Sequence, residues 1–317
     1  MRISSPAKIN LFLEVGERRS DGFHPLRTVF ARLALADTLS IAPAPGAASS
    51  LQVDFNHDYP LSCRKQLRDS DTNIVMDSWR LLASRFPSIL ERPVKMTLHK
   101  MIPCGAGLGG GSSNAASALI ALTRYYRLPL SGARLLDLAA KLGSDVPFFI
   151  ACHPRSGYRK TPSPVWYAQG KGDSDLKDLV LHIKKPLLII YPGFPVSTKM
   201  AYAALDFQGG LLLTKETVLH KLYGILSDRS HIAFSNSRGR RCMALNSFAD
   251  VIFNRYPLLR CLHATLVLAG ARFATLSGSG SCVYAIGDSD EQVRSWTAML
   301  SVMPQFRALT YYMSHIT

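Results

Sequence analysis

Residues 103–118 read Pro103-Cys104-Gly105-Ala106-Gly107-Leu108-Gly109-Gly110-Gly111-Ser112-Ser113-Asn114-Ala115-Ala116-Ser117-Ala118. Five glycines lie within seven residues of this run, and glycines let a backbone approach a ligand closely. The small residues after them predict the start of a helix. Backbone N–H groups of the loop and of that helix end then form a cradle for an anion such as a nucleotide phosphate, and the serines add hydroxyl donors or help to hold Mg²⁺. The run is neither a Walker A loop, because no Gly-Lys-Ser/Thr follows, nor a dinucleotide-binding turn.

The segments around this loop predict the elements that carry it. Residues 94–100 alternate between apolar and polar side chains, which predicts a strand that leads directly into the glycines. The spacing of apolar residues predicts a helix over 73–86, and two more helices over about 113–126 and 131–142. A flexible glycine linker is disfavoured, because linkers do not run from a strand into an alanine-rich helix.

The apolar patterns near the N-terminus and in the second half of the chain predict further strands. Near the N-terminus, residues 9–15, 28–35 and 37–41 read as three strands bounded by turn signals. In the second half, residues 187–191 form an apolar strand, two helical segments follow, and a strand–glycine–strand unit occupies 272–286. Helices and strands therefore alternate irregularly, which indicates the α+β class.

One stretch predicts where the chain divides. Residues 152–164 are rich in Pro, Ser, Gly and basic side chains, a composition typical of a boundary between domains. We therefore expect two α+β domains, formed by residues 1–158 and 159–317.

The composition narrows the class of protein. The 317 residues are 47% hydrophobic and 19% charged, as in folded globular proteins. No apolar run approaches the ~18 residues that a membrane-spanning helix needs, and the N-terminus shows no signal-peptide pattern. We expect a cytoplasmic protein without membrane partners. Its net charge of +15 favours anionic partners, which include nucleotides, nucleic acids and phosphorylated metabolites.

The cysteines and histidines give no sign of a metal centre. No C-x-x-C pair and no H-E-x-x-H motif occurs, so we expect no protein metal site. In a chain of this size the six scattered cysteines are expected to be reduced and mostly buried thiols. They are Cys63, Cys104, Cys152, Cys242, Cys261 and Cys282.

Three weaker signals also carry polar groups suited to chemistry. Lys8 and Asn10 flank one apolar residue in the first strand and so point to the same face. Asp145 lies among apolar neighbours at an expected helix-to-strand turn, where its pKa can be tuned, although such a residue is more often a cap. Residues 276–282 form a second glycine-rich turn, which alone reads as a plain tight turn.

Together these motifs resemble the GHMP kinase superfamily. Its members carry an N-terminal strand with a lysine, a Pro-x-x-x-Gly-Leu-Gly-x-x-Ser-Ser loop and a C-terminal glycine-rich turn, and all three occur here in that order. The resemblance implies a two-domain fold, with a ribosomal-S5-like ATP-binding domain followed by a ferredoxin-like α/β sandwich domain. It also implies an ATP-dependent small-molecule kinase that uses Mg²⁺.

Four segments look like one branch of that superfamily. They are Ser5-Pro6-Ala7-Lys8-Ile9-Asn10-Leu11-Phe12-Leu13, Asp21-Gly22-Phe23-His24-Pro25-Leu26, Gly107 to Ser113 and Asp145-Val146-Pro147-Phe148-Phe149. This bacterial branch phosphorylates the C2 hydroxyl of a cytidine diphosphate derivative of methylerythritol, in non-mevalonate isoprenoid biosynthesis. Its members act on a small molecule, as monomers or homodimers.

The resemblance assigns roles at the reacting centre. Asp145 would be the base that takes the proton from the C2 hydroxyl, and Lys8 would keep that carboxylate ionised and orient the attack. Asn10 would bind the substrate near the reacting atoms.

The cytidine end of the substrate has its own expected residues. The cytosine would lie between Phe23 and Tyr202, and His24 would read its edge. Thr198 is a further expected substrate contact. The branch usually has Tyr at the position of Phe23 and often Phe at that of Tyr202. Both rings are therefore kept here, and the phenolic hydroxyl lies on the opposite side of the cytosine.

The nucleotide would be held by the glycine-rich run and by two residues outside it, Asn73 and Lys100. Within the run, the expected contacts are Pro103, Gly105, Ala106, Gly107, Leu108, Gly109, Gly110, Gly111, Ser112 and Ser113. The chain departs from the branch at Gly170-Lys171-Gly172-Asp173, where a Gly-x-Gly-Glu turn is usual, and at Asn246-Ser247-Phe248, where Asn-Asp-Leu is usual.

Three alternatives remain at this stage. Another GHMP kinase, such as homoserine kinase, would share the ATP loop but has no reason to carry the segment around His24. A basic RNA-binding protein with an S5-like domain would suit the charge but has no use for the phosphate loop. An inactive relative would be free to lose Lys8 and Asp145, and both are present.

Overall fold

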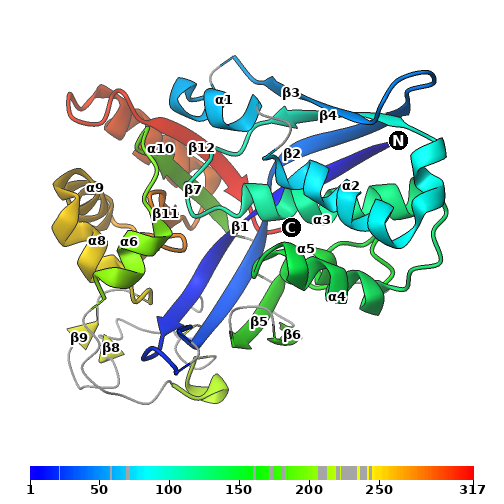
Figure 1. Ribbon diagram of the computed structural model, residues 1–317. Coiled ribbons are helices and arrows are strands. Elements are labelled where there is room, and N and C mark those ends of the chain that lie inside the picture. Colours follow the sequence, from blue (N-terminus) through cyan, green and yellow to red (C-terminus); the bar gives the residue numbers. More distant parts are fainter. Residues whose placement is uncertain are drawn as a thin grey trace. The chain divides into compact units, whose positions relative to one another are not determined.

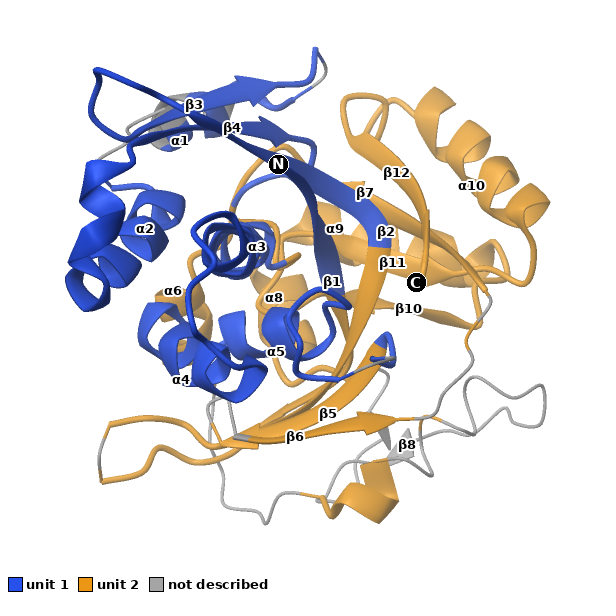
Figure 2. Cartoon of the chain, turned by 90° about the vertical axis from the view of Figure 1, so that its right-hand side faces the viewer, with its two compact units in different colours: residues 1–8, 34–104, 109–164 blue, residues 9–33, 105–108, 165–317 orange. Residues whose placement is uncertain are grey.

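The computed structural model describes most of the chain, and its elements are labelled in Figure 1. The described residues are 1–20, 22–57, 59–68, 72–159, 162–170, 174–179, 183, 185–205, 213–218, 222, 234–235, 241–242 and 245–317. The chain divides into two compact units, coloured separately in Figure 2. Unit 1 comprises Met1–Lys8, Ala34–Cys104 and Gly109–Pro164, and unit 2 comprises Ile9–Leu33, Gly105–Leu108 and Val165–Thr317.

Two long strands contribute residues to both units. They are β1 (Arg2–Val15) and β2 (Leu26–Pro43), which pair with each other. The two strands expected over 28–35 and 37–41 are in fact the single strand β2. The expected break fell at Ala36, next to the charged Asp37, but the carboxylate of Asp37 is hydrogen-bonded and completely buried, so the strand continues through both residues.

Unit 1 combines strand pairing with a packed set of helices. β4 pairs in parallel with β3 and antiparallel with the second half of β2. Helix α3 is buried along most of its length and packs against α2, α4 and α5. The other elements of this unit are β3 (Ser50–Phe55), α1 (Leu61–Arg68), α2 (Ile74–Arg85), the 3₁₀ helix η1 (Pro87–Glu91), β4 (Val94–Lys100), α3 (Gly110–Tyr125), α4 (Gly132–Leu142) and α5 (Val146–Ala151).

Unit 2 contains two groups of paired strands. The first half of β2 pairs with β5, which pairs with β6, and a second, four-stranded antiparallel sheet has the order β10-β11-β7-β12. Its described elements are β5 (Val165–Gly170), β6 (Ser174–Leu179), β7 (Pro186–Tyr191), α6 (Thr198–Ala203), β8 (Phe234–Ser235), β9 (Arg241–Cys242), α8 (Ala249–Arg255), α9 (Pro257–Leu268), β10 (Phe273–Leu276), β11 (Val283–Ile286), α10 (Asp290–Val302) and β12 (Thr310–His315).

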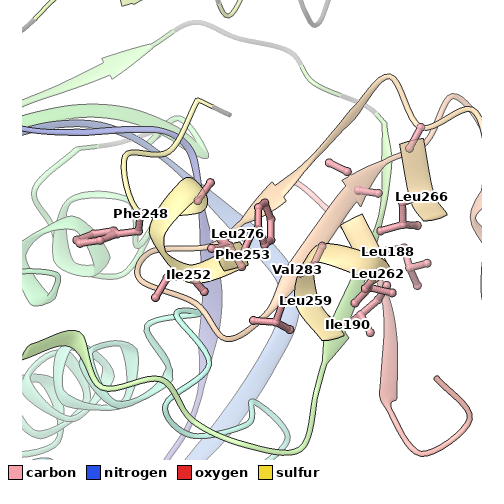
Figure 3. Close-up of a cluster of buried hydrophobic side chains, with 14 of the residues drawn as sticks. Leu188, Ile190, Phe248, Ile252, Phe253, Leu259, Leu262, Leu266, Leu276 and Val283 are labelled. Atoms are coloured by element: carbon pink, nitrogen blue, oxygen red, sulfur yellow. The ribbon is translucent and has the colours of Figure 1, made fainter. Parts of the chain in front are cut away.

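The core of unit 2 lies between this sheet and its helices, as Figure 3 shows. Leu259, Leu262 and Leu266 recur along α9 at helical spacing and are completely buried. They pack with Leu188 and Ile190 of β7 in one hydrophobic cluster. This cluster secures the strands that border the second glycine-rich turn.

The cysteines correct one expectation. Cys63 of α1 and Cys104 form a disulfide, whereas reduced thiols were expected throughout. The sequence gave no signal for it, because the two cysteines are 41 residues apart and meet only through the fold. Cys152 and Cys282 are buried free thiols, Cys261 is an exposed one, and the side chain of Cys242 lies outside the described part of the chain.

Among the described residues, no helix is both long and apolar enough to cross a membrane.

Candidate functional site

The glycine-rich loop ends at the start of α3, which begins at Gly110 rather than at the expected residue 113. Gly109 caps the helix in the left-handed conformation, with φ +68°, and the amide of Ser113 donates to its carbonyl at 2.9 Å. A long helix that begins inside the loop presents its unpaired first-turn N–H groups there, and these groups attract anions.

Glycine is required at Gly109 by its neighbours. An added Cβ would lie 3.0 Å from Cγ of Lys8 and 3.0 Å from Cζ of Phe149. The loop therefore passes directly against the lysine that the sequence analysis singled out. At Gly111, by contrast, no heavy atom of the described residues outside its own helix turn lies within 4 Å of the Cβ position, so open space adjoins the helix end.

The first half of the loop belongs to unit 2, where the second glycine-rich turn holds it. The hydroxyl of Ser277 donates to the carbonyl of Gly107 at 2.7 Å, and the amide of Cys282 donates to that of Ala106 at 3.1 Å. A Cβ on Gly107 would lie 1.9 Å from the carbonyl oxygen of Ser277, and φ at Gly107 is +76°. The turn over 276–282, which alone reads as an ordinary turn, thus supports the phosphate loop.

Lys8 and Asp145 form an ion pair within unit 1. The Nζ of Lys8 lies 3.5 Å from Oδ2 of Asp145, and the exposed fractions of the two side chains are 4% and 29%. Burial lowers the pKa of Lys8 below its usual value, and the nearby Asp145 carboxylate opposes that shift. A buried ammonium beside a partly exposed carboxylate can fix the orientation of that carboxylate while a hydroxyl approaches it.

The setting of Asp145 differs from the expected one. The residue occupies the turn between α4 and α5, two helices, whereas a helix-to-strand turn was expected. Residues 146–151 are helical because Pro147 falls in the first turn, where the fixed φ of proline is favourable. Asp145 stands at the cap position of α5, but its side chain makes no capping hydrogen bond. Its carboxylate points instead to Lys8.

Asn10 follows Lys8 on β1 and is also buried. Its side-chain amide donates to the hydroxyl of Thr28 at 2.7 Å, and that hydroxyl donates to the carbonyl of Phe12 at 2.7 Å. This chain of hydrogen bonds fixes the orientation of the Asn10 amide. Lys8 and Asn10 are therefore positioned by the same strand, as their spacing predicted.

The residues expected at the cytidine end lie in unit 2. The rings of His24 and Tyr202 are 5.2 Å apart at 30°, and Tyr202 meets Phe248 edge-on at 5.0 Å. Nδ1 of His24 lies 3.0 Å from the carbonyl oxygen of Gly16; a carbonyl oxygen can only accept, so Nδ1 is the donor, and the tautomer that fits this bond has Nε2 as its acceptor. Phe23 is 51% exposed.

Two further residues, expected from the sequence to contact substrate or nucleotide, lie at helix starts. Thr198 begins α6, and its hydroxyl lies 3.1 Å from that of Ser279 in the second glycine-rich turn. Asn73 caps α2, where its side chain accepts from the amide of Val75 at 3.0 Å. Asp21 and residues 171–173, which the sequence analysis compared with relatives, lie outside the described residues.

Lys100 is completely enclosed, together with two residues that the sequence analysis did not select. Its ammonium donates to the carboxylate of Asp37 and to Oδ1 of Asn114, the latter at 3.0 Å. The only hint in the sequence was a carboxylate within an apolar strand segment. Its partners, more than 60 residues away in sequence, could not be identified from the pattern.

The loop suits the phosphates of ATP on three observations. The N-terminus of α3 opens onto free space at Gly111. The hydroxyl of Ser113 is buried and has no hydrogen-bond partner within the described part of the chain. The side chain of Lys8 passes beside Gly109, with its Cγ 3.0 Å from the Cβ position. No group of three or more His, Cys, Asp or Glu side chains suited to a metal ion occurs among the residues described.

Comparisons with known proteins agree with this site. Residues 73–153 match the model of the GHMP kinases N terminal domain, and residues 233–303 match the GHMP kinases C terminal model. The 4-diphosphocytidyl-2-C-methyl-D-erythritol kinase of Solibacter usitatus is 35% identical over 280 residues, which cover 88% of this chain and 79% of the relative.

Solved structures show the same relationship. A crystal structure of 4-(cytidine 5'-diphospho)-2C-methyl-D-erythritol kinase superposes with a TM-score of 0.70 at 29% identity and covers 99% of both chains. Homoserine kinase from Cytophaga hutchinsonii, with a TM-score of 0.63 at 17% identity over 100% of this chain and 94% of its own, shares the fold alone.

These findings confirm the two-domain GHMP kinase fold and the ATP-dependent small-molecule kinase that the motifs predicted. The chain belongs to the 4-diphosphocytidyl-2-C-methyl-D-erythritol kinase family of the GHMP kinases.

Proposed function

We propose that this protein transfers the γ-phosphate of ATP to the C2 hydroxyl of 4-diphosphocytidyl-2-C-methyl-D-erythritol, in the non-mevalonate route to isoprenoid precursors. The observation that carries the proposal is the ion pair of Lys8 and Asp145, 3.5 Å apart, with Lys8 in contact range of Gly109 in the phosphate loop. The relatives that cover most of the chain act, by their names, on this substrate.

Asp145 takes the proton of the attacking hydroxyl in this proposal. A positioned base of this kind contributes about 10²–10⁴-fold to the rate. Lys8 keeps the carboxylate ionised and orients the hydroxyl, and Asn10, two residues further along β1, binds the substrate near the reacting atoms. Most of the remaining acceleration comes from holding the reactants in line and from neutralising charge on the transferred group.

ATP is held by the loop residues 103–113, with Asn73 on the nucleotide side. Backbone N–H groups at the start of α3 and the hydroxyls of Ser112 and Ser113 donate to phosphate oxygens. The same two hydroxyls would help to hold an Mg²⁺ ion bound with ATP, which would supply positive charge to neutralise the phosphates. The positive φ of Gly109 keeps the backbone close enough for such contacts without a side chain in the way.

The cytidine end is read by His24, Phe23, Tyr202 and Thr198. The acceptor Nε2 that the tautomer of His24 provides is complementary to the exocyclic amino group of cytosine, which is a donor. Tyr202 packs beside His24 and offers an aromatic face to the base, and Phe23 is exposed enough to cover the other face.

We further propose a cytoplasmic enzyme that works as a monomer or homodimer, without nucleic-acid or membrane partners. The division into an ATP-binding domain over 1–158 and a second domain over 159–317 stays a prediction. Homoserine phosphorylation has less support, since the homoserine kinase neighbour shares only the fold and the segment around His24 has no purpose there.

The variant Asp145→Asn tests the proposed chemistry. It keeps the shape of the side chain and removes the base, so kcat should fall by about 10²-fold or more while ATP still binds. Asp137→Asn is the matched control, because Asp137 on the neighbouring helix α4 is 68% exposed and pairs with Arg134 on the surface. Turnover of Asp145→Asn equal to that of the control would remove Asp145 from the role of base.

A further inference from the structure

A buried cluster beneath the glycine-rich loop contains two residues, Asp37 and Asn114, that have no role in the chemistry described so far. Asp37 of β2, Lys100 at the end of β4 and Asn114 of α3 have exposed fractions of 0%, 2% and 2%. We propose that these three residues form a clamp that holds the two ends of the loop at the spacing ATP requires, an inference that rests on the proposed function of that loop. They are positioning residues in this proposal, because each side chain is almost fully buried and is bonded to the other two.

The carboxylate of Asp37 makes the central contacts. Its Oδ1 accepts from the backbone amides of Met101 at 2.7 Å and Ile102 at 2.8 Å. Its Oδ2 accepts from the side-chain amide of Asn114 at 2.9 Å and from the ammonium of Lys100. One carboxylate thus binds the chain on both sides of the loop, since residues 101–102 precede it and Asn114 follows it.

A third contact, between Lys100 and Asn114, completes the cluster. The ammonium of Lys100 donates to Oδ1 of Asn114 at 3.0 Å, so each member contacts both others. The start of α3 rests directly on the cluster, since the Cβ position of Gly110 is 3.4 Å from Nζ of Lys100 and 3.0 Å from Cγ2 of Ile102. A shift of the cluster would therefore shift the helix N-terminus that faces the phosphates.

The charges of the clamp indicate that it acts by positioning the loop, and not by attracting the phosphates of ATP directly. One cation and one anion in contact cancel at a distance, so the cluster adds little net field at the phosphates. The ammonium of Lys100 is engaged by Asp37 and Asn114, which gives this residue a role beneath the loop; its expected contact with the nucleotide stays a prediction. The pair is stable only while complete, because removing one partner leaves a buried charge uncompensated.

The variant Asp37→Asn distinguishes a positioning role from an electrostatic one, because the two roles predict opposite changes in the affinity for ATP. Loss of a negative charge beneath a site for a polyanion should strengthen ATP binding if only Coulomb attraction mattered. The clamp predicts the opposite, because the new amide NH₂ faces the donors of Lys100 and Asn114 and displaces the loop ends. We expect the affinity for a non-hydrolysable ATP analogue to fall about 10-fold, as measured by calorimetry with the full chain.

The control is Asp54→Asn, which removes the same charge from β3 of the same unit at a carboxylate that is 36% exposed and paired with His99. Its analogue affinity should stay within about 2-fold of the parent. If Asp37→Asn does not fold, Asn114→Ala replaces it, because this change keeps the Asp37–Lys100 ion pair and suits a helix. Weaker analogue binding in either variant supports the clamp.

Unchanged or tighter binding, with the fold intact, would overturn the proposal. A purely structural role would lower the melting temperature and leave the affinity of the folded protein unchanged, which is also a contradicting result. Because binding of the analogue is measured without the alcohol substrate, an error in the proposed substrate would show separately, as absent turnover of the parent enzyme with that substrate.

Discussion

Replacing Gly109 by alanine perturbs the point where the phosphate loop meets the ion pair. The residue has φ +68°, a conformation that costs a residue with a Cβ about 1–2 kcal/mol. The new methyl group would lie 3.0 Å from Cγ of Lys8 and 3.0 Å from Cζ of Phe149, and such overpacking adds about 1–3 kcal/mol. The free energy of unfolding should therefore fall by about 2–5 kcal/mol in total.

Activity should fall as well, since the crowding acts on the ion pair. The methyl group can be accommodated only if Lys8 or Phe149 moves, and Lys8 is 3.5 Å from Asp145. Displacement of a catalytic group by a fraction of an ångström commonly costs about 10-fold or more in rate. We expect kcat of the folded variant to fall by about this factor, measured by ADP release under conditions where urea unfolding shows that the variant is fully folded.

Gly111→Ala is the matched comparison within the same loop. Among the described residues, none outside its own helix turn has a heavy atom within 4 Å of the new Cβ, and the residue lies inside α3, where alanine is favoured over glycine by about 0.5–1 kcal/mol. This variant should be at least as stable as the parent, whatever its effect on ATP binding. Equal unfolding free energies for Gly109→Ala and Gly111→Ala would refute the account of the loop.

Three further changes test other parts of the account. Reduction of the Cys63–Cys104 disulfide, which spans 41 residues, should lower the free energy of unfolding by up to about 4 kcal/mol, measured by melting with and without dithiothreitol; identical curves would contradict the bond. Burial lowers the pKa of Lys8, so kcat should fall as the pH rises through that value, below the usual 10.5. Over the same pH range the contribution of Lys8 to the free energy of unfolding should rise with pH, because the unfolded chain binds more protons than the folded one. A rate profile that stays flat up to pH 10.5 would exclude the Lys8 ammonium from the chemistry. His24→Ala should raise KM for the cytidine substrate much more than KM for ATP, and an equal rise in both would assign His24 a structural role.

The sequence predicted those parts of the fold that local patterns determine. The strand β4 and the helices α2 and α4 appear within one or two residues of their expected limits, since their periodicity is uninterrupted. Lys8 and Asp145 could be selected in advance because a known family carries both within recognisable motifs. Their 3.5 Å approach depends on the packing of α5 against α3, which no local pattern encodes.

The misses share a physical cause. The sequence predicted two strands that meet next to Asp37, because a charged residue interrupts the apolar pattern of β2. The partners that bury this carboxylate lie 63 to 77 residues further along the chain, so no local pattern reveals them. The disulfide was missed for the same reason. The early start of α3 contradicts the low helix propensity of glycine, which tertiary contacts at Gly109 and Gly110 override.

The most direct test of the central claim is ADP production by the purified protein with Mg²⁺-ATP and 4-diphosphocytidyl-2-C-methyl-D-erythritol, beside homoserine and mevalonate. The account predicts turnover with the cytidine substrate alone, and its loss by about 10²-fold or more in Asp145→Asn. Turnover with homoserine or mevalonate in place of the cytidine substrate would contradict the proposed function.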